Sequence, residues 1–494
     1  MLSIGYDIGS SSIKAAIINV ENGKMVAGGF YPKEEMKINS PYVGWAEQDP
    51  ETWWEYVKLL TRKLLSENHI DGKEIKSIGI SYQMHGLVLV DKNQSVIRPS
   101  IIWCDSRAVE IGNIAFDKIG GERCLSHLLN SPGNFTASKL RWVKENEPGN
   151  YKKIFKWMLP GDFIAMKLSG EVVSTVSGLS EGIFWDFKEK NISKDVLSNY
   201  EIDSSLMPNI KPTFGEQGRL TKSAAAELGF NEGIVISYRA GDQPNNAFSL
   251  DVLNPGEIAA TAGTSGVVYG VIDKVNYDPK SRVNTFIHVN NDNENNRLGV
   301  LLCINGTGIL NSWIRKNFAS DLSYDGMNSL AGKVSIGSDG VSILPFGNGA
   351  ERVLENQNIG CQINDLDFNR HTKAHVLRAA QEGIAFSFKY GVDIMKEMGL
   401  EIQVIRAGKA NMFLSSIFSQ TLSNITGASI ELYDTDGAQG AARGAAYGAG
   451  FYGSFKEAFQ SLNKVGEINC IDKEKESSIS AYNLWLSKLK LFLK

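Results

Sequence analysis

Residues 7–14 read Asp7-Ile8-Gly9-Ser10-Ser11-Ser12-Ile13-Lys14, and mostly apolar runs lie on either side of this turn. Turn residues between two extended runs predict a β-hairpin. The pattern returns half a chain later, where Ala262-Gly263-Thr264-Ser265-Gly266 separates the apolar runs 257–261 and 267–271. A repeat at this spacing predicts two similar domains and not a solenoid of short units. We place the boundary near residues 250–255, so that residues 1–250 and 251–494 form the two domains.

Both turns contain the residue types that bind phosphate. Glycine lets backbone N–H groups approach an anion closely, and serine and threonine add hydroxyl donors. In the first turn Lys14 can add positive charge, and Asp7 can hold Mg²⁺ through water because this ion keeps several waters and few carboxylates. One such turn is compatible with an ordinary hairpin, but two at matching places can clamp the phosphates of ATP between two domains. We predict ATP contacts at Gly9, Ser10, Ser11, Lys14, Gly263, Thr264 and Ser265.

Helical and extended patterns alternate along the rest of the chain. Apolar residues at helical spacing predict helices over residues 51–66, 374–398, 411–425 and 438–451. Short apolar runs predict strands over residues 77–81, 402–407 and 429–432. Such alternation is typical of layered α/β domains. Small residues at positions 437, 440, 444 and 448 share one face of the last helix, which favours close helix packing.

An acidic residue follows an apolar strand just before the predicted boundary, in Ala240-Gly241-Asp242-Gln243-Pro244. Its place next to the boundary predicts that it faces the cleft between the domains. Phosphoryl transfer needs positioning, Mg²⁺ and a carboxylate that accepts the hydroxyl proton. Asp242 fits this base role and can also contact the metal. A single aspartate in a loop is otherwise most often a turn former, so the prediction depends on the two glycine turns.

Two further stretches follow apolar strands, Gln83-Met84-His85-Gly86 and Trp103-Cys104-Asp105-Ser106-Arg107. Their amide, imidazole, carboxylate and guanidinium groups supply donors and acceptors for a polyhydroxylated ligand, and Trp103 offers a flat apolar face. There are plain structural alternatives. His85 can be a hydrogen-bonded structural histidine, and Asp105 and Arg107 can pair with each other.

Composition and charge exclude several classes. The 494 residues carry 51 basic and 55 acidic side chains without a basic block, which argues against nucleic acid as a partner. No apolar run approaches the roughly 20 residues that span a bilayer, and no signal-peptide pattern begins the chain, so we expect a cytoplasmic protein with no membrane partner. The five scattered cysteines form no CxxC pair, which predicts buried free thiols. The absence of a GxxxxGK[ST] motif excludes a P-loop kinase.

Several further segments, together with the two turns, resemble the FGGY family of carbohydrate kinases within the actin-like ATPase superfamily. The resemblance covers nearly the whole chain. Residues 44–50 and 136–146 are similar to stretches common in these kinases, and residues 344–352 look like the segment that ends in Gly-Glu-Arg, here Glu351-Arg352. Residues 381–386 look like the family's Glu-Gly helix, and residues 407–411 look like its adenosine loop.

The resemblance implies an α/β fold of two actin-like (ribonuclease H-like) ATPase domains with a catalytic cleft between them. It also implies ATP and Mg²⁺ as cofactors. Carried over by position, Asp242 is the base and Met84 and His85 contact the sugar. The positions implied on the nucleotide side are Gly308, Gly408 and Asn411.

Within the family, residues 83–86 and 103–107 are most similar to the branch that phosphorylates xylulose. This implies transfer of the ATP γ-phosphate to the terminal hydroxyl of a ketopentose. Gln243 and Cys104 stand where this branch usually has asparagine, so another sugar or polyol, such as ribulose or fuculose, stays open. We predict substrate contacts at Gln83, Met84, His85, Trp103, Asp105, Arg107 and Gln243.

Alternatives from other classes also stay open. An actin-like ATPase that works as a chaperone or filament would hydrolyse ATP regardless of sugar, and an inactive regulator would bind sugar without turnover. The presence of Asp7, Asp242 and both turns argues against the inactive form. The small-molecule partners expected are the sugar and ATP, and a homodimer is left open.

Overall fold

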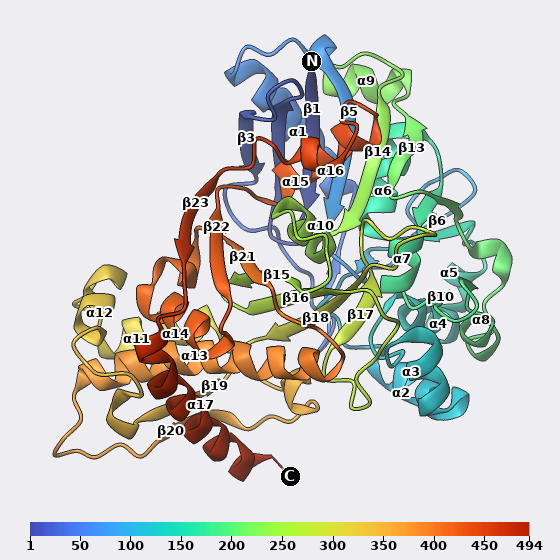
Figure 1. The fold of residues 1–494 in the computed structure, drawn as a ribbon. Coiled ribbons are helices and arrows are strands. Elements are labelled where there is room, and N and C mark those ends of the chain that lie inside the picture. The colour runs from blue at the N-terminus through green and yellow to red at the C-terminus, as the bar shows by residue number, and fades with distance from the viewer. Residues whose placement is uncertain (494) are drawn as a thin grey trace.

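The computed structural model describes residues 1–493 and contains two mixed β-sheets, with helix α10 (Asp242–Ser249) between them (Figure 1). The strand order is β13-β14-β5-β1-β2-β3 in the first sheet and β17-β18-β16-β15-β21-β22-β23 in the second. The strands of the first sheet are β1 (Leu2–Ile8), β2 (Ile13–Asn19), β3 (Met25–Tyr31), β5 (Ile75–Tyr82), β13 (Phe214–Arg219) and β14 (Val235–Gly241). Those of the second are β15 (Glu257–Ala262), β16 (Gly266–Ile272), β17 (Asn284–Ile287), β18 (Leu298–Ile304), β21 (Val404–Gly408), β22 (Ser429–Tyr433) and β23 (Lys464–Ile468).

Helices cover the two sheets, and short strand pairs lie outside them. The other α-helices are α1 (Pro50–Glu67), α2 (Val109–Ile119), α3 (Gly121–Leu128), α4 (Thr136–Asn146), α5 (Pro148–Tyr151), α6 (Pro160–Ser169), α7 (Val176–Glu181), α8 (Lys194–Asn199), α9 (Lys222–Leu228), α11 (Gly308–Phe318), α12 (Tyr324–Ala331), α13 (Lys373–Glu397), α14 (Ser416–Thr426), α15 (Gly437–Gly448), α16 (Phe455–Ala458) and α17 (Asp472–Phe492). The short strands are β4 (Glu47–Gln48), β6 (Val88–Val90), β7 (Ser100–Ile101), β8 (Lys156–Met158), β9 (Val173–Thr175), β10 (Trp185–Asp186), β11 (Asn191–Ile192), β12 (Asn209–Lys211), β19 (Ser342–Phe346) and β20 (Gly360–Asn364). None of the described helices is both long and apolar enough to cross a membrane.

The two sheets repeat one pattern. In the first, β1 is antiparallel to β2 and parallel to β5; in the second, β15 is antiparallel to β16 and parallel to β21. The two predicted hairpins are therefore equivalent elements of two similar sheets. The boundary predicted from sequence lies in the connection between α10 and β15.

Most predicted elements agree with the structure to within one or two residues. The helix predicted over residues 51–66 is α1, and Asp49 caps it by accepting a hydrogen bond from the backbone N–H of Glu51 at 3.0 Å. The helix predicted over residues 411–425 is wrong at its start. Residues 411–414 form a 3₁₀ turn, and α14 begins only after Ser415, whose hydroxyl caps the backbone N–H of Phe418.

Helix α15 belongs to the second half of the chain by sequence but packs on β1 and β5 of the first sheet (Figure 1). Its small residues make this possible. A Cβ on Gly5 of β1 would lie 2.1 Å from the backbone nitrogen of Ala442, and one on Gly444 of the helix would lie 2.7 Å from the ring of Tyr238. The predicted close packing is confirmed, and the second half of the chain supplies a helix that covers the first sheet.

Strand β17, at the edge of the second sheet, is also held by side chains from the first half of the chain. The Asn130 amide donates to the carbonyl of Thr285 at 2.8 Å and accepts from its N–H at 3.0 Å. The hydroxyl of Ser177 donates to the carbonyl of Ile287 at 2.9 Å, and that of Ser180 accepts from its N–H at 3.0 Å. Four hydrogen bonds therefore tie this margin of the second sheet to the first half of the chain.

The five cysteines are all free thiols, as predicted, but only Cys124 is buried. The expectation of burial is wrong for Cys104, Cys303 and Cys361, which are exposed, and for Cys470, which is half-buried. Cys104 lies in a surface turn after β7, and Cys303 is the one exposed side chain of β18, so local strand and turn geometry decides their exposure.

Candidate active site

Parallel strands bring Asp7, residues 83–86 and Asp242 to one edge of the first sheet. β5 runs parallel to both β1 and β14, with Asp7 opposite Ser81 and Gly241 opposite Tyr82. Residues that follow parallel neighbours leave the sheet at the same edge, where α/β proteins bind their ligands. The cluster predicted from sequence is therefore assembled by the register of three strands.

Asp7 and Asp242 are two carboxylates with little countercharge. Burial raises the pKa of Asp7, while Lys14, its register partner on β2, and a 2.9 Å hydrogen bond from Ser81 lower it. Burial, and then the charge of Asp7, raise the pKa of Asp242 to about 7, against hydrogen bonds from the backbone and side chain of Gln243. No ion pair with either carboxylate occurs within residues 1–493. Such a pair has the chemistry of a divalent cation site.

His85 is neutral, and its tautomer follows from its partner. Nδ1 lies 3.0 Å from the backbone carbonyl oxygen of Glu181, which can only accept, so Nδ1 carries the proton. Burial lowers the pKa of the imidazole to about 3. The ring packs against Phe135 at 4.7 Å and Phe286 at 5.4 Å between centroids. Nε2 is left as an acceptor for a ligand hydroxyl.

Glu181 is a neighbour of Asp242 that the sequence did not indicate. It is only 2% exposed, and a Cβ on Gly241 would lie 2.5 Å from its Oε2. Burial and the charge of Asp242 raise the pKa of the Glu181 carboxyl well above its usual range. The candidate base therefore has a second buried carboxyl beside it, that of Glu181. Glu181 ends α7, and neither its spacing nor its surroundings in the sequence point to this place.

Polar contacts join the sugar-side residues to the first turn. The indole N–H of Trp103, which is 54% exposed, donates to the hydroxyl of Ser10 at 3.2 Å. The Gln48 amide donates to the carbonyl of Ser10 at 2.7 Å and accepts from the Gln83 amide at 3.5 Å. Oε1 of Gln83 is buried without a partner in the described part of the chain. Gln83 and Trp103 therefore lie at the first turn, with Gln48 as a link between Gln83 and Ser10.

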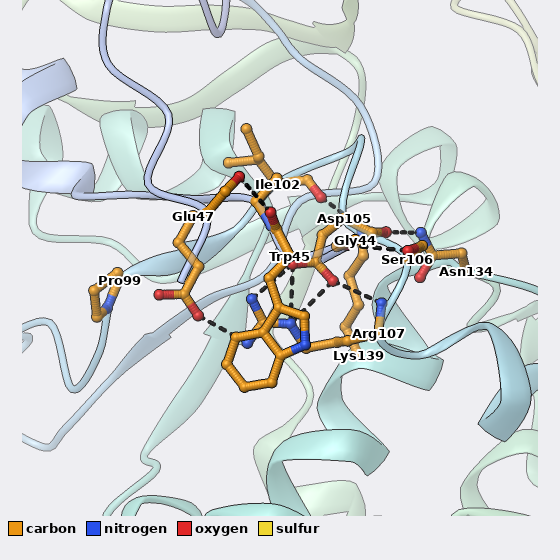
Figure 2. Close-up of polar contacts among 12 residues, drawn as sticks. Gly44, Trp45, Glu47, Pro99, Ile102, Asp105, Ser106, Arg107, Asn134 and Lys139 are labelled. Atoms are coloured by element: carbon orange, nitrogen blue, oxygen red, sulfur yellow. Dashed lines mark hydrogen bonds and ion pairs between the residues drawn. The ribbon is translucent and has the colours of Figure 1, made fainter. Parts of the chain in front are cut away.

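The structure gives Asp105 and Arg107 a different setting from the one predicted. They form a buried ion pair at 2.6 Å, with 0% and 1% of their side chains exposed. Arg107 also pairs with Glu47 at 2.7 Å and lies 3.6 Å from the centroid of the Trp45 ring (Figure 2). Their charged groups are directed at each other and not at the cleft, which is the alternative that the sequence left open.

Lys139 connects the turn at residues 83–86 to the turn at residues 103–107 through hydrogen bonds to backbone carbonyl groups. Its side chain is fully buried, and Nζ donates to the carbonyl oxygen of His85 at 2.8 Å and to that of Ile102 at 3.0 Å. Figure 2 labels Lys139 and Ile102. Burial lowers the pKa of this amine to about 7. Lys139 thus ties the turn after β5 to the turn that begins at Trp103. The sequence placed this residue in a family-like stretch but assigned no role to it.

The second turn is joined to the start of α11. The backbone N–H of Gly308 donates to the carbonyl of Gly263 at 2.9 Å, and that of Ile309 donates to Thr264 at 3.1 Å. A Cβ on Gly263 would lie 3.6 Å from the Asn411 amide nitrogen. Gly408 ends β21, the parallel neighbour of β15. The positions expected on the nucleotide side, Ser265 of the same turn included, therefore surround the second hairpin.

Gly308→Ala is expected to weaken ATP binding. The added Cβ would lie 2.3 Å from the carbonyl oxygen of Gly263, so the turn must move. Loss of about one charged hydrogen bond predicts a KM for ATP about tenfold higher, with the KM for sugar changed less than about threefold. Steady-state kinetics with each substrate varied in turn measures this. Gly149→Ala, whose Cβ meets open space, is the control, and equal KM values in both variants would contradict the role of the turn.

Two similar α/β domains, with carboxylates at a shared strand edge and a glycine turn in each, define a phosphotransferase of the actin-like ATPase type. The chain belongs to the FGGY family of carbohydrate kinases: the family's N-terminal domain matches residues 2–249 and its C-terminal domain matches residues 258–452. It is therefore a two-domain carbohydrate kinase, and the expected fold class is confirmed.

Named relatives and solved structures agree with this family. The chain is 28% identical to the xylulose kinase of Bacillus subtilis over 409 residues, 81% of this chain and 79% of the relative. Its fold matches the xylulose kinase of Rhodospirillum rubrum with a TM-score of 0.90 at 23% identity over 99% of both chains. It also matches Plasmodium falciparum glycerol kinase with ADP, with a TM-score of 0.89 at 21% identity over 100% and 98% of the two chains.

Proposed function

We propose that this kinase transfers the γ-phosphate of ATP to the terminal hydroxyl of D-xylulose and releases D-xylulose 5-phosphate and ADP. The observation that carries the proposal is the position of Asp242, which begins α10 between the two sheets (Figure 1), at the strand edge that also carries Asp7. Burial and the charge of Asp7 raise the pKa of this carboxyl to about 7, which suits a general base near neutral pH. The sugar is proposed from relatives that are named xylulose kinase.

In this mechanism Asp242 accepts the proton of the terminal hydroxyl as its oxygen attacks the γ-phosphorus in line. The P–O bond to the leaving ADP oxygen breaks as the new bond forms, and the proton ends on the Asp242 carboxyl. The backbone and side chain of Gln243 donate to this carboxylate and hold it in place. Its position at the start of α10 stabilises the ionised form and offsets part of the unfavourable effect of burial.

Residues of the first half of the chain hold the sugar in this proposal. Nε2 of His85 accepts from a hydroxyl, and the unpartnered Oε1 of Gln83 accepts from another. Met84, which packs against Gly241, and the exposed face of Trp103 provide apolar contact. Asp105 and Arg107 pair with each other, stabilise the loop of residues 103–107 and do not contact the sugar.

The two turns hold the phosphates through backbone N–H groups and hydroxyls. Asp7, through water, and Asp242 would hold Mg²⁺, and the ion when bound neutralises charge that develops on the phosphates. The effect of Asp7 on the pKa of Asp242, and the lack of ion pairs with either carboxylate among residues 1–493, support this. We propose that the reaction is cytoplasmic and that the sugar and ATP are the small molecules the kinase binds. A homodimer is compatible with this mechanism.

The test is a coupled ADP-release assay over ketoses, aldoses and polyols, with Mg²⁺ and with EDTA. We expect the highest kcat/KM with D-xylulose and loss of turnover in EDTA that excess Mg²⁺ restores. Higher turnover with ribulose, fuculose or a polyol would change the substrate and keep the kinase class. ATP hydrolysis that no sugar stimulates would contradict the proposal.

A further inference from the structure

Arg352 is a cation that lies beside the candidate sugar site. It begins a 3₁₀ turn (Arg352–Leu354) after β19, in the second half of the chain. Nη1 donates to two neutral acceptors, Oδ1 of Asn284 at 2.9 Å and the carbonyl of Ser281 at 3.3 Å. Within residues 1–493 no carboxylate pairs with its guanidinium, and neither Nε nor Nη2 makes a hydrogen bond. These two donor groups are available to a ligand.

Its immediate neighbours belong to the sugar side of the cleft. Nη2 lies 3.7 Å from the place of a Cβ on Gly133, in the loop before α4 of the first half. Asn284, its hydrogen-bond partner, is on β17 together with Phe286, whose ring packs on His85. The guanidinium therefore stands where the second half of the chain meets the residues around His85 in the first half.

The electrostatics of the neighbouring groups agree with this placement. The positive charge of Arg352 contributes to the low pKa of His85. The charges of both Asp242 and Arg352 act on the pKa of the Cys303 thiol, the first raising it and the second lowering it. Glu351 does not neutralise its neighbour, since its carboxylate accepts from the backbone N–H of Asn305 at 2.9 Å. Arg352 is thus a donor across the site from the candidate base.

The proposed substrate presents an acceptor that suits such a donor. A ketopentose phosphorylated at C5 must react as the open chain, because ring closure onto the C2 ketone would use the same C5 hydroxyl. The reacting sugar therefore has a free C2 carbonyl oxygen at the end remote from the phosphorus. A guanidinium donates but cannot accept, so it favours a carbonyl or carboxylate oxygen over a hydroxyl.

We propose that Arg352 is a specificity-determining residue that hydrogen-bonds the C2 ketone oxygen of the open-chain sugar. The inference rests on the proposed function and adds a substrate contact from the second domain. It assigns the discrimination of a ketose from its reduced polyol to one side chain. The same donor would also bind the carboxylate of a sugar acid.

The test compares kcat/KM for D-xylulose with kcat/KM for xylitol and D-arabinitol, the two polyols that reduction of the ketone gives. In Arg352→Met we expect the value for D-xylulose to fall about 10- to 100-fold, as for loss of a charged hydrogen bond. The values for the polyols should change less than about threefold, so the preference for the ketose collapses. Arg352→Lys should recover part of it. Arg370→Met, which removes an exposed cation paired with Asp339, is the control.

The outcomes separate the two proposals. An equal loss for ketose and polyols in Arg352→Met, with D-xylulose still the substrate of the wild type, would overturn the role of Arg352 alone. A wild type that prefers a sugar acid would overturn D-xylulose as substrate, and Arg352→Met must then abolish that preference. A wild type that prefers a polyol would overturn both.

Discussion

Asp242→Asn is expected to lower kcat by about 10²–10⁴-fold, the usual contribution of general-base catalysis. The asparagine keeps the shape of the side chain and can still donate a hydrogen bond, but it cannot accept the proton of the sugar hydroxyl. Its effect is measured by single-turnover and steady-state ADP release at saturating ATP and sugar. Asp242→Ala should give a similar loss.

The fold of this variant should be intact. Burial raises the pKa of Asp242, so the ionised carboxylate is unfavourable there and asparagine should leave the thermal midpoint equal or higher. Asp49→Asn, at the cap of α1, is a matched control because asparagine also caps helices well. Near-normal turnover in Asp242→Asn would exclude Asp242 as the base.

Arg107→Met is expected to destabilise the protein by about 3–5 kcal/mol, because it leaves the Asp105 carboxylate buried without its partner. The variant also loses the ion pair with Glu47 and the cation–π contact with Trp45. Denaturant unfolding followed by tryptophan fluorescence, together with the thermal midpoint, measures the change. The turn around Trp103 should unfold together with the residues that surround this ion pair.

Two controls show that the buried charge is the cause. Arg123→Met removes an exposed guanidinium paired with Asp195 at 2.6 Å and should lower the free energy of unfolding far less than Arg107→Met does. The double variant Asp105→Asn/Arg107→Met should recover a large part of the loss, since no buried charge is left unpaired. A loss in Arg107→Met as small as in Arg123→Met would contradict the argument.

The elements that local patterns encode were predictable from the sequence. Glycine and hydroxyl residues between apolar runs identified both hairpins, and the strand before Asp242 placed this residue at a sheet edge. Small residues in α15 predicted its close packing, although not that it would pack on the first sheet. These features depend on residues a few positions apart, which is the range that periodicity and turn chemistry cover.

The parts that could not be predicted depend on residues far apart in the chain. Asp105 and Arg107 are two positions apart, but their burial is decided by Glu47 and Trp45, which a separate segment supplies. Glu181 reaches Gly241 only through the packing of α7. Similarly, nothing beside Lys139 in the sequence shows that its amine binds two carbonyl groups from different turns. The sequence shows which charged group a residue carries, but it does not show which distant residue that group pairs with in the fold.

The attachment of β17 has a mechanical consequence for how the kinase admits and releases its substrates. One margin of the second sheet, strand β17, is hydrogen-bonded to side chains from the first half of the chain, those of Asn130, Ser177 and Ser180. At about 0.5–1.5 kcal/mol for each of the four hydrogen bonds, pulling this margin apart would cost several kcal/mol. These bonds therefore restrain movement of β17 relative to the first half of the chain.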